Sequence, residues 1–137
     1  LGVALHAPSV HPFNPLPLLR LCIAAGPNRR VVEALMRHVW RGGEDAGDAS
    51  RIDALTRELA PARDPSSDEV KAELRAATDA AIARGVFGVP TFELGGRLFW
   101  GLEALPMLRA ALLGDAWFDG PTWDEAGAAR PARHRSR

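Results

Sequence analysis

The one side chain of this sequence that could act as a thiol nucleophile or a redox centre is Cys22. There is no second cysteine, so the chain can form neither an internal disulfide nor a Cys-x-x-Cys redox pair. The neighbours of Cys22 are apolar: Leu18, Leu19, Leu21 and Ile23. Such neighbours do not lower the pKa of a thiol. We therefore predict that Cys22 is a buried, small hydrophobic residue, and the single cysteine is consistent with a reducing cytoplasm.

The four histidines are the other side chains that could bind a metal. They are His6, His11, His38 and His134. Their spacing does not match that of a zinc site, and none has an obvious carboxylate partner in the sequence. We therefore predict no metal site.

The first 84 residues are predicted to be mainly helical. Asn14 and Pro15 suit the start of a helix, as capping residue and first helical residue, and Gly26-Pro27 ends that helix. Apolar residues then recur at helical spacing in three further segments. The predicted helices cover 29–40, 49–59 (with Asp48 or Ser50 as the cap) and a longer segment from about Pro65 or Ser67 to Arg84.

The pattern changes after Gly85. Val86–Leu94 reads as a turn that leads into a strand, Gly95-Gly96 is a two-residue hairpin signal, and Arg97–Trp100 is the return strand. A last helix is predicted from about Glu103 to Leu113. Its inward-facing residues should be Leu105, Leu108 and Leu112. From Asp119 onward the sequence shows no periodicity, and we expect disorder.

A hairpin by itself is marginally stable in water, and it normally joins a larger sheet or packs on a helix. Within the chain only the first few residues, such as Gly2 to Leu5, could provide another strand. The chain also begins with Leu1 rather than methionine. The expectation is therefore that further strands of the sheet belong to a segment upstream of this sequence.

Composition narrows the range of functions. Apolar residues make up 47% of the chain and charged residues 25%, as in ordinary soluble globular proteins. Basic and acidic residues balance at 17 each, so no electrostatic argument favours nucleic acid or an anionic membrane as a partner. No apolar run approaches the ~20 residues that a membrane-spanning helix needs.

Two segments carry a family resemblance. The run from Arg84 to Leu105, RGVFGVPTFELGGRLFWGLEAL, resembles the C-terminal signature of the 2-hydroxychromene-2-carboxylate isomerase family. The earlier run HPFNPLPLLRL, which begins at His11, also resembles that family. The family is related to kappa-class glutathione transferases and to the disulfide-forming, DsbA-like thioredoxin domains.

The resemblance implies an α/β fold that is thioredoxin-like (DsbA-like), with a helical insertion and with the N-terminal βαβ portion absent from this chain. Residues 1–118 would form a partial thioredoxin-like domain. Within it, 14–84 would be mainly the helical insertion, and 86–113 would form the Val-Pro hairpin and the C-terminal helix. Residues 119–137 would be a disordered tail.

The resemblance also implies glutathione as the cofactor. In thioredoxin-like folds the proline that corresponds to Pro90 follows a cis peptide bond, so the Val89-Pro90 bond is expected to be cis. The Val89 N–H and C=O would then face outward and pair with an extended peptide such as glutathione. Trp100, Gly101 and Leu102 would lie at the γ-glutamyl end, whose ammonium would pair with Glu103. The family usually has aspartate at that position.

Asn14 and Pro15 match the family segment that borders the substrate. Asn14 could contact a ligand, or it could simply cap its helix. Trp40 could form an aromatic wall for a small aromatic substrate, although such a tryptophan is also a common core residue.

The resemblance implies no catalytic residue in this chain, because the family serine that activates the glutathione thiol follows the first strand, upstream of the Asn-Pro segment. The expected function is a glutathione-dependent isomerase of a 2-hydroxychromene-2-carboxylate type substrate. The expected location is the cytoplasm, and a homodimer is the candidate assembly. The alternatives are a DsbA-like thiol-disulfide oxidoreductase and a non-catalytic helical interaction module. A Cys-x-x-Cys motif upstream would indicate the former.

Overall fold

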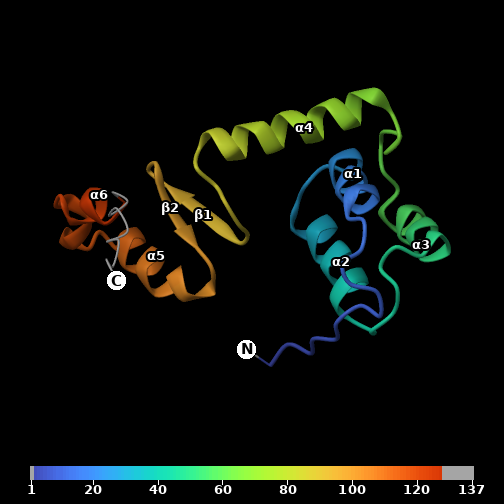
Figure 1. The fold of residues 1–137 in the computed structure, drawn as a ribbon, viewed down its shortest axis with the longest axis horizontal. Helices are drawn as coiled ribbons and strands as arrows, with labels where there is room; N and C mark the ends of the chain where they lie inside the picture. Colours follow the sequence, from blue (N-terminus) through green and yellow to red (C-terminus); the bar gives the residue numbers. More distant parts are fainter. Residues whose placement is uncertain (1, 128–137) are drawn as a thin grey trace, which may run out of the picture. The chain divides into compact units, whose positions relative to one another are not determined.

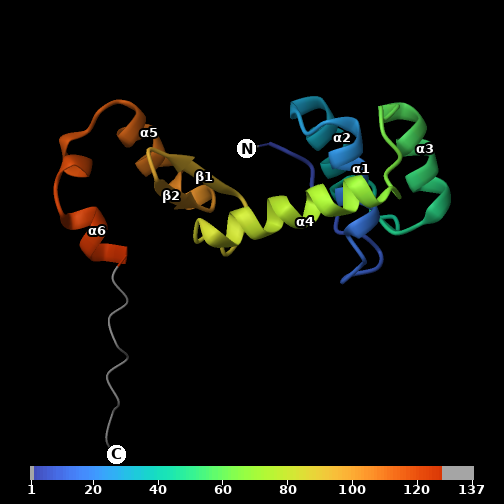
Figure 2. The same ribbon diagram turned by 90° about the horizontal axis from the view of Figure 1, so that it is seen from above.

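The computed structural model describes residues 2–127 (Figures 1 and 2). The chain divides into two compact units, Leu1–Ala83 and Arg84–Arg137, which are described separately. The first unit contains α1 (Leu16–Ala25), α2 (Arg29–Trp40), α3 (Ala49–Leu59) and α4 (Asp68–Ala83). The second contains β1 (Thr91–Leu94), β2 (Arg97–Trp100), the 3₁₀ turn η1 (Leu102–Ala104), α5 (Leu105–Leu112), η2 (Ala116–Asp119) and α6 (Thr122–Gly127).

The core of the first unit lies among α1, α2 and α3. One apolar face of each helix is turned inward, as the helical spacing of the apolar residues predicts. The buried cluster comprises Leu18, Leu21, Val31, Leu35, Val39, Ala46, Leu55 and Leu59. The α4 helix contributes the fully buried Val70, whereas residues 75–80 of the same helix are exposed. Only the first part of α4 is therefore anchored by burial within this unit.

The bounds of α2 and α3 agree with the sequence prediction because side chains cap both helices. The Asn28 side chain accepts a hydrogen bond from the Val31 N–H at 3.1 Å, and Asp48 accepts one from the Arg51 N–H at 2.9 Å. These bonds satisfy amides that the helix itself leaves without partners. The Ser50 hydroxyl and the Arg51 amide lower the pKa of Asp48, so this cap stays ionised at neutral pH.

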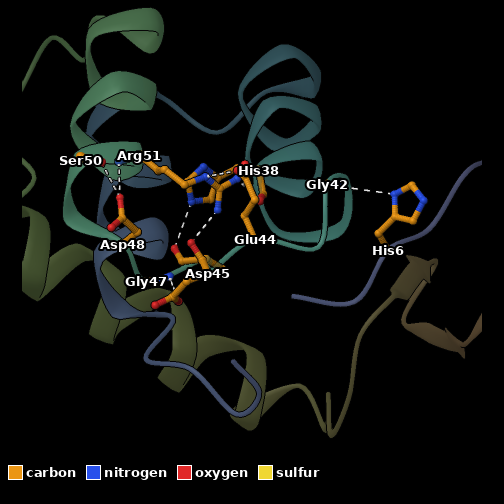
Figure 3. Close-up of polar contacts among 10 residues, drawn as sticks. His6, His38, Gly42, Glu44, Asp45, Gly47, Asp48, Ser50 and Arg51 are labelled. Carbon is orange, nitrogen blue, oxygen red and sulfur yellow. Dashed lines mark hydrogen bonds and ion pairs between the residues drawn. The ribbon is translucent and has the colours of Figure 1, made fainter. Parts of the chain in front are cut away.

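The loop between α2 and α3 is held by the Arg51 side chain (Figure 3). The guanidinium donates to the carbonyl of Asp45 at 2.6 Å and to the carbonyl of His38 at 3.1 Å. It also forms an ion pair with Glu44 at 2.7 Å. The Arg51 side chain is only 24% exposed, so these bonds are better shielded from water than a surface ion pair.

The hairpin of the second unit turns at the predicted residues. Phe92 lies opposite Phe99, and the turn residues Gly95 and Gly96 have φ angles of 57° and 79°. Positive φ at both central residues is what a type I′ turn requires, and glycine adopts it without steric cost. Among the described residues the sheet has these two strands only, so Gly2–Leu5 do not form a strand.

The segment after α5 covers one face of this hairpin, because Phe118 and Trp123 pack on Phe99, with ring centroids 6.1 and 5.0 Å away. Phe99 is 1% and Phe118 5% exposed, and Arg97 donates to the Phe118 carbonyl at 2.6 Å. The expected disorder from residue 119 is therefore wrong for 119–127, where aromatic burial stabilises η2 and α6. Residues 128–137 lie outside the described part of the chain.

A second correction concerns the helix after the hairpin. Leu105, Leu108 and Leu112 are predicted to face inward, yet Leu105 is exposed, Leu108 is partly buried and Leu112 is 64% exposed. The spacing does form a helix, α5, but a two-stranded sheet does not cover its whole apolar face. Amphipathic spacing predicts the helix correctly, while burial depends on the area of the partner surface.

Replacing Phe118 with alanine should unfold the hairpin unit selectively. Loss of a buried phenylalanine costs about 3 kcal/mol or more. Backbone amides of β1 and β2 should therefore exchange with solvent much faster, while those of α2 keep their protection. The control is Leu113→Ala, because Leu113 is in the same unit but 71% exposed. Unchanged hairpin exchange in Phe118→Ala would mean that the aromatic cluster does not support the hairpin.

Replacing Arg51 with methionine should destabilise the helical unit by roughly 1–3 kcal/mol, because the carbonyls of His38 and Asp45 lose their donor. Urea denaturation followed by circular dichroism measures this change. Arg57→Met is the matched control on the same helix, because Arg57 is exposed and its change should lie within about 0.5 kcal/mol. Equal effects of the two substitutions would show that the Arg51 contacts contribute nothing specific.

Candidate functional site

The Val89-Pro90 peptide bond is cis, as expected from the resemblance. Two hydrogen bonds fix the backbone around it. The Gly101 N–H donates to the Pro90 carbonyl at 2.9 Å, and the Thr91 hydroxyl donates to the Gly88 carbonyl at 2.5 Å. Val89 lies between these two anchored carbonyls, and it is 87% exposed.

The polar backbone groups of Val89 are available to a ligand. The bond between Gly101 and Pro90 extends the hairpin pairing by one step beyond Thr91 and Trp100, and Val89 is the next residue. Within residues 2–127, no backbone hydrogen bond uses the Val89 N–H or C=O. A peptide backbone in extended form can therefore pair with Val89 as one more short strand.

Two aromatic rings lie beside this loop. The rings of Phe87 and Trp100 are 5.0 Å apart between centroids, and both side chains are largely exposed. The Trp100 indole lies so close to Gly88 that a Cβ at that position would be 2.6 Å from Nε1. Glycine at position 88 is thus what lets the indole lie against the loop backbone.

Glu103 lies at the start of the turn that follows the hairpin. Gly101 has a φ of 85° and is buried, and the Glu103 carboxylate folds back over it, so that a Cβ at Gly101 would collide with the carboxylate. No side chain caps the first turn of η1. The Glu103 and Leu102 side chains are exposed, and Glu103 forms no ion pair with the part of the chain that the structure covers. A carboxylate and open amides therefore lie together at this turn.

The predicted substrate residues belong to the helical unit. The Asn14 side-chain oxygen accepts a hydrogen bond from the Leu16 N–H at 3.1 Å, although Asn14 is not the N-cap residue of α1. The helix begins one residue later than predicted, with Pro15 in the capping position. The Asn14 side chain is exposed, so its NH₂ group remains available.

Pro15 and Trp40 line the same apolar groove, a cavity of about 330 Å³ whose walls come from α1, α2 and the preceding segment. Its other lining residues are Phe13, Leu18, Leu19, Cys22, Val32, Leu35, Met36 and Val39. Residue spacing alone did not single out Phe13 or Met36 as site residues. The sequence feature that could have pointed to this groove is an apolar residue on the face of α2 that does not pack in the core, such as the exposed Met36.

Cys22 lines this groove and is partly buried, and desolvation raises the pKa of its thiol. A raised pKa reduces the thiolate fraction at neutral pH. This supports the interpretation of Cys22 as a packing residue. The described residues contain no cluster of ligands for a metal ion. No helix in residues 2–127 is long and apolar enough to cross a bilayer.

The six predicted cofactor residues, from Val89 to Glu103, therefore lie around one end of the hairpin in the second unit, and Pro15 and Trp40 share one groove in the first. Comparison with family models finds that the DSBA-like thioredoxin domain matches residues 1–113. Neither the curated proteins nor the solved structures include a significant match to the chain. The family match covers most of the sequence and agrees with the α/β elements described above. The chain belongs to the DSBA-like thioredoxin domain family.

Proposed function

We propose that this chain binds glutathione at the Val89-Pro90 loop and serves a glutathione-dependent isomerase of a small aromatic substrate, of the 2-hydroxychromene-2-carboxylate type. The observation that carries the proposal is the free Val89 backbone, held one step beyond the hairpin pairing. Membership of the DSBA-like family supports a thiol-disulfide oxidoreductase-type or glutathione transferase-like superfamily. The isomerase activity is what we propose beyond that membership.

The hairpin end offers partners for each part of glutathione. The Val89 N–H and C=O can pair with the cysteinyl backbone of the tripeptide. The open amides of Leu102 and Glu103 suit the γ-glutamyl carboxylate. The Glu103 carboxylate, which has no ion-pair partner within the described residues, suits the γ-glutamyl ammonium. The observed residues therefore fit the cofactor in both backbone pairing and charge.

Bound glutathione would supply a thiolate nucleophile for reversible addition to the substrate. The residues of this chain would bind and orient glutathione and the substrate, and none of the 137 residues would be catalytic. The Val89 backbone would fix the position of the cysteinyl unit, and Glu103 would fix the opposite end. Pro15, Trp40 and the exposed amide of Asn14 would contact the aromatic substrate.

The single thiol of the chain weighs against disulfide chemistry carried by these residues. Cys22 lies in an apolar groove, and burial raises its pKa. Disulfide exchange requires an accessible thiolate. Isomerase function needs no protein thiol, whereas the oxidoreductase alternative needs a Cys-x-x-Cys pair outside these 137 residues.

Glu103→Gln should weaken the binding of reduced glutathione about tenfold, because the ammonium loses a charge-assisted hydrogen bond. Glu103→Asp should keep most of the affinity, because it retains the charge. The affinities are measured by titration of the ¹⁵N-labelled chain, which also reports the Val89 amide and the Trp100 indole directly. Glu93→Gln, an exposed carboxylate in the same unit, is the matched control and should bind normally.

A second ligand separates charge pairing from a structural effect of the substitution. N-Acetylglutathione lacks the ammonium, so Glu103→Gln should change its affinity little. The proposal fails if millimolar glutathione leaves the Val89 and Glu103 amide signals unmoved. It also fails if Glu103→Gln binds glutathione as the unmodified chain does.

A further inference from the structure

The apolar groove of the helical unit opens next to a second hollow that carries charge. This second hollow has a volume of about 340 Å³ and shares Met36 and Trp40 with the groove. Its remaining walls come from α2 and the N-terminal segment: Val3, Ala4, Leu5, Glu33, Arg37 and Arg41. The apolar cavity and the cavity with two guanidinium groups are therefore neighbours that share the Met36 and Trp40 side chains.

The two arginines differ in what they already bind. Arg37 forms an ion pair with Glu33 at 2.5 Å, one helical turn earlier, so Glu33 neutralises it. Arg41 follows the last residue of α2, its side chain is exposed, and it forms no ion pair or side-chain hydrogen bond with residues 2–127. The hollow therefore contains one uncompensated positive charge, on Arg41.

The backbone around Trp40 is held in place. The His6 N–H donates to the Trp40 carbonyl at 2.8 Å, which ties the N-terminal segment to the end of α2. The Gly42 N–H, just after Arg41, contacts His6 Nδ1 at 3.4 Å (Figure 3). These bonds keep Val3–Leu5 as one wall of the hollow, and they fix the backbone on both sides of Arg41.

We propose that the two hollows together bind an aromatic carboxylic acid, with its ring system in the groove against Trp40 and its carboxylate on Arg41. The groove is almost entirely apolar, so a charged or strongly hydrated group would lose its water there without a partner. The ring belongs in that part. The carboxylate belongs at Arg41, because a guanidinium offers paired N–H donors that match its two oxygens.

This inference rests on the proposed function in placing an aromatic substrate at Trp40, and it adds the residue that selects for the anion. It makes Arg41 a specificity-determining residue. An amide of the same shape would fill the groove equally well but would leave the guanidinium without its charge partner. Because all contacting residues lie in the Leu1–Ala83 unit, the aromatic acid should bind in the absence of glutathione.

The test uses 2-naphthoate as the acid and 2-naphthamide as its neutral counterpart, with the full chain, without glutathione, by isothermal titration calorimetry. The unmodified chain should bind the acid more tightly than the amide. Arg41→Gln should weaken 2-naphthoate about tenfold and leave 2-naphthamide unchanged. Trp40→Leu should weaken both. Arg57→Gln removes an exposed arginine outside both hollows and should change neither affinity.

Equal affinity for the acid and the amide would overturn the inference, as would acid binding that Arg41→Gln does not weaken, or no binding of either compound. Thermal unfolding of Arg41→Gln checks that the fold is kept. The outcome is separable from that for glutathione. Glutathione binding without naphthoate binding rejects this inference alone, and naphthoate binding without glutathione binding rejects the cofactor proposal alone.

Discussion

The candidate cofactor site depends on one backbone hydrogen bond, from the Gly101 N–H to the Pro90 carbonyl. This bond carries the hairpin pairing one residue past Thr91 and Trp100, and it brings the start of η1 to the end of the hairpin. Val89 precedes this bonded proline and makes no backbone hydrogen bond within residues 2–127, and Glu103 lies on the turn that follows Gly101. Gly101 is required here by its positive φ and by the Glu103 carboxylate that covers it.

The hairpin that contains this bond is itself stabilised by aromatic residues that pack on one of its faces. A two-stranded sheet buries too little surface to be stable alone, and the packing of Phe118 and Trp123 on Phe99 supplies the missing contact. Residues 114–127 follow the part matched by the family model, so Phe118 and Trp123 lie outside the matched region. The proposed binding at Val89 therefore depends on packing by Phe118 and Trp123, which come later in the chain.

Local signals in the sequence predicted most of the fold. The α2 and α3 helices have the predicted bounds because periodicity and caps such as Asp48 agree, and Gly95-Gly96 determined the turn. The sequence could not predict burial on α5, which depends on how much sheet is there to cover Leu112. It also missed the fold of 116–127, because Trp117, Phe118 and Trp123 follow neither helical nor strand spacing. Phe118 and Trp123 are held by contact with Phe99, and Trp117 packs on these two rings.

The candidate site, like the fold, could be predicted from the sequence only in part. The cis bond before Pro90 and the clustering of the residues around Glu103 follow from a resemblance to a family, and composition alone did not suggest them. Of the residues around this groove, the sequence predicted only Pro15 and Trp40 as site residues. The position of Val3–Leu5 beside Met36 and Arg41 depends on how the N-terminal segment returns to α2.

Hydrogen exchange of the Val89 amide, with and without reduced glutathione, tests the central claim most directly. The free amide should exchange rapidly in the unliganded chain, because it has no partner among the described residues, and saturating glutathione should slow it. The Leu94 amide serves as the internal reference within the hairpin. A Val89 amide that is already protected without ligand, or one that glutathione leaves unprotected, would contradict the account.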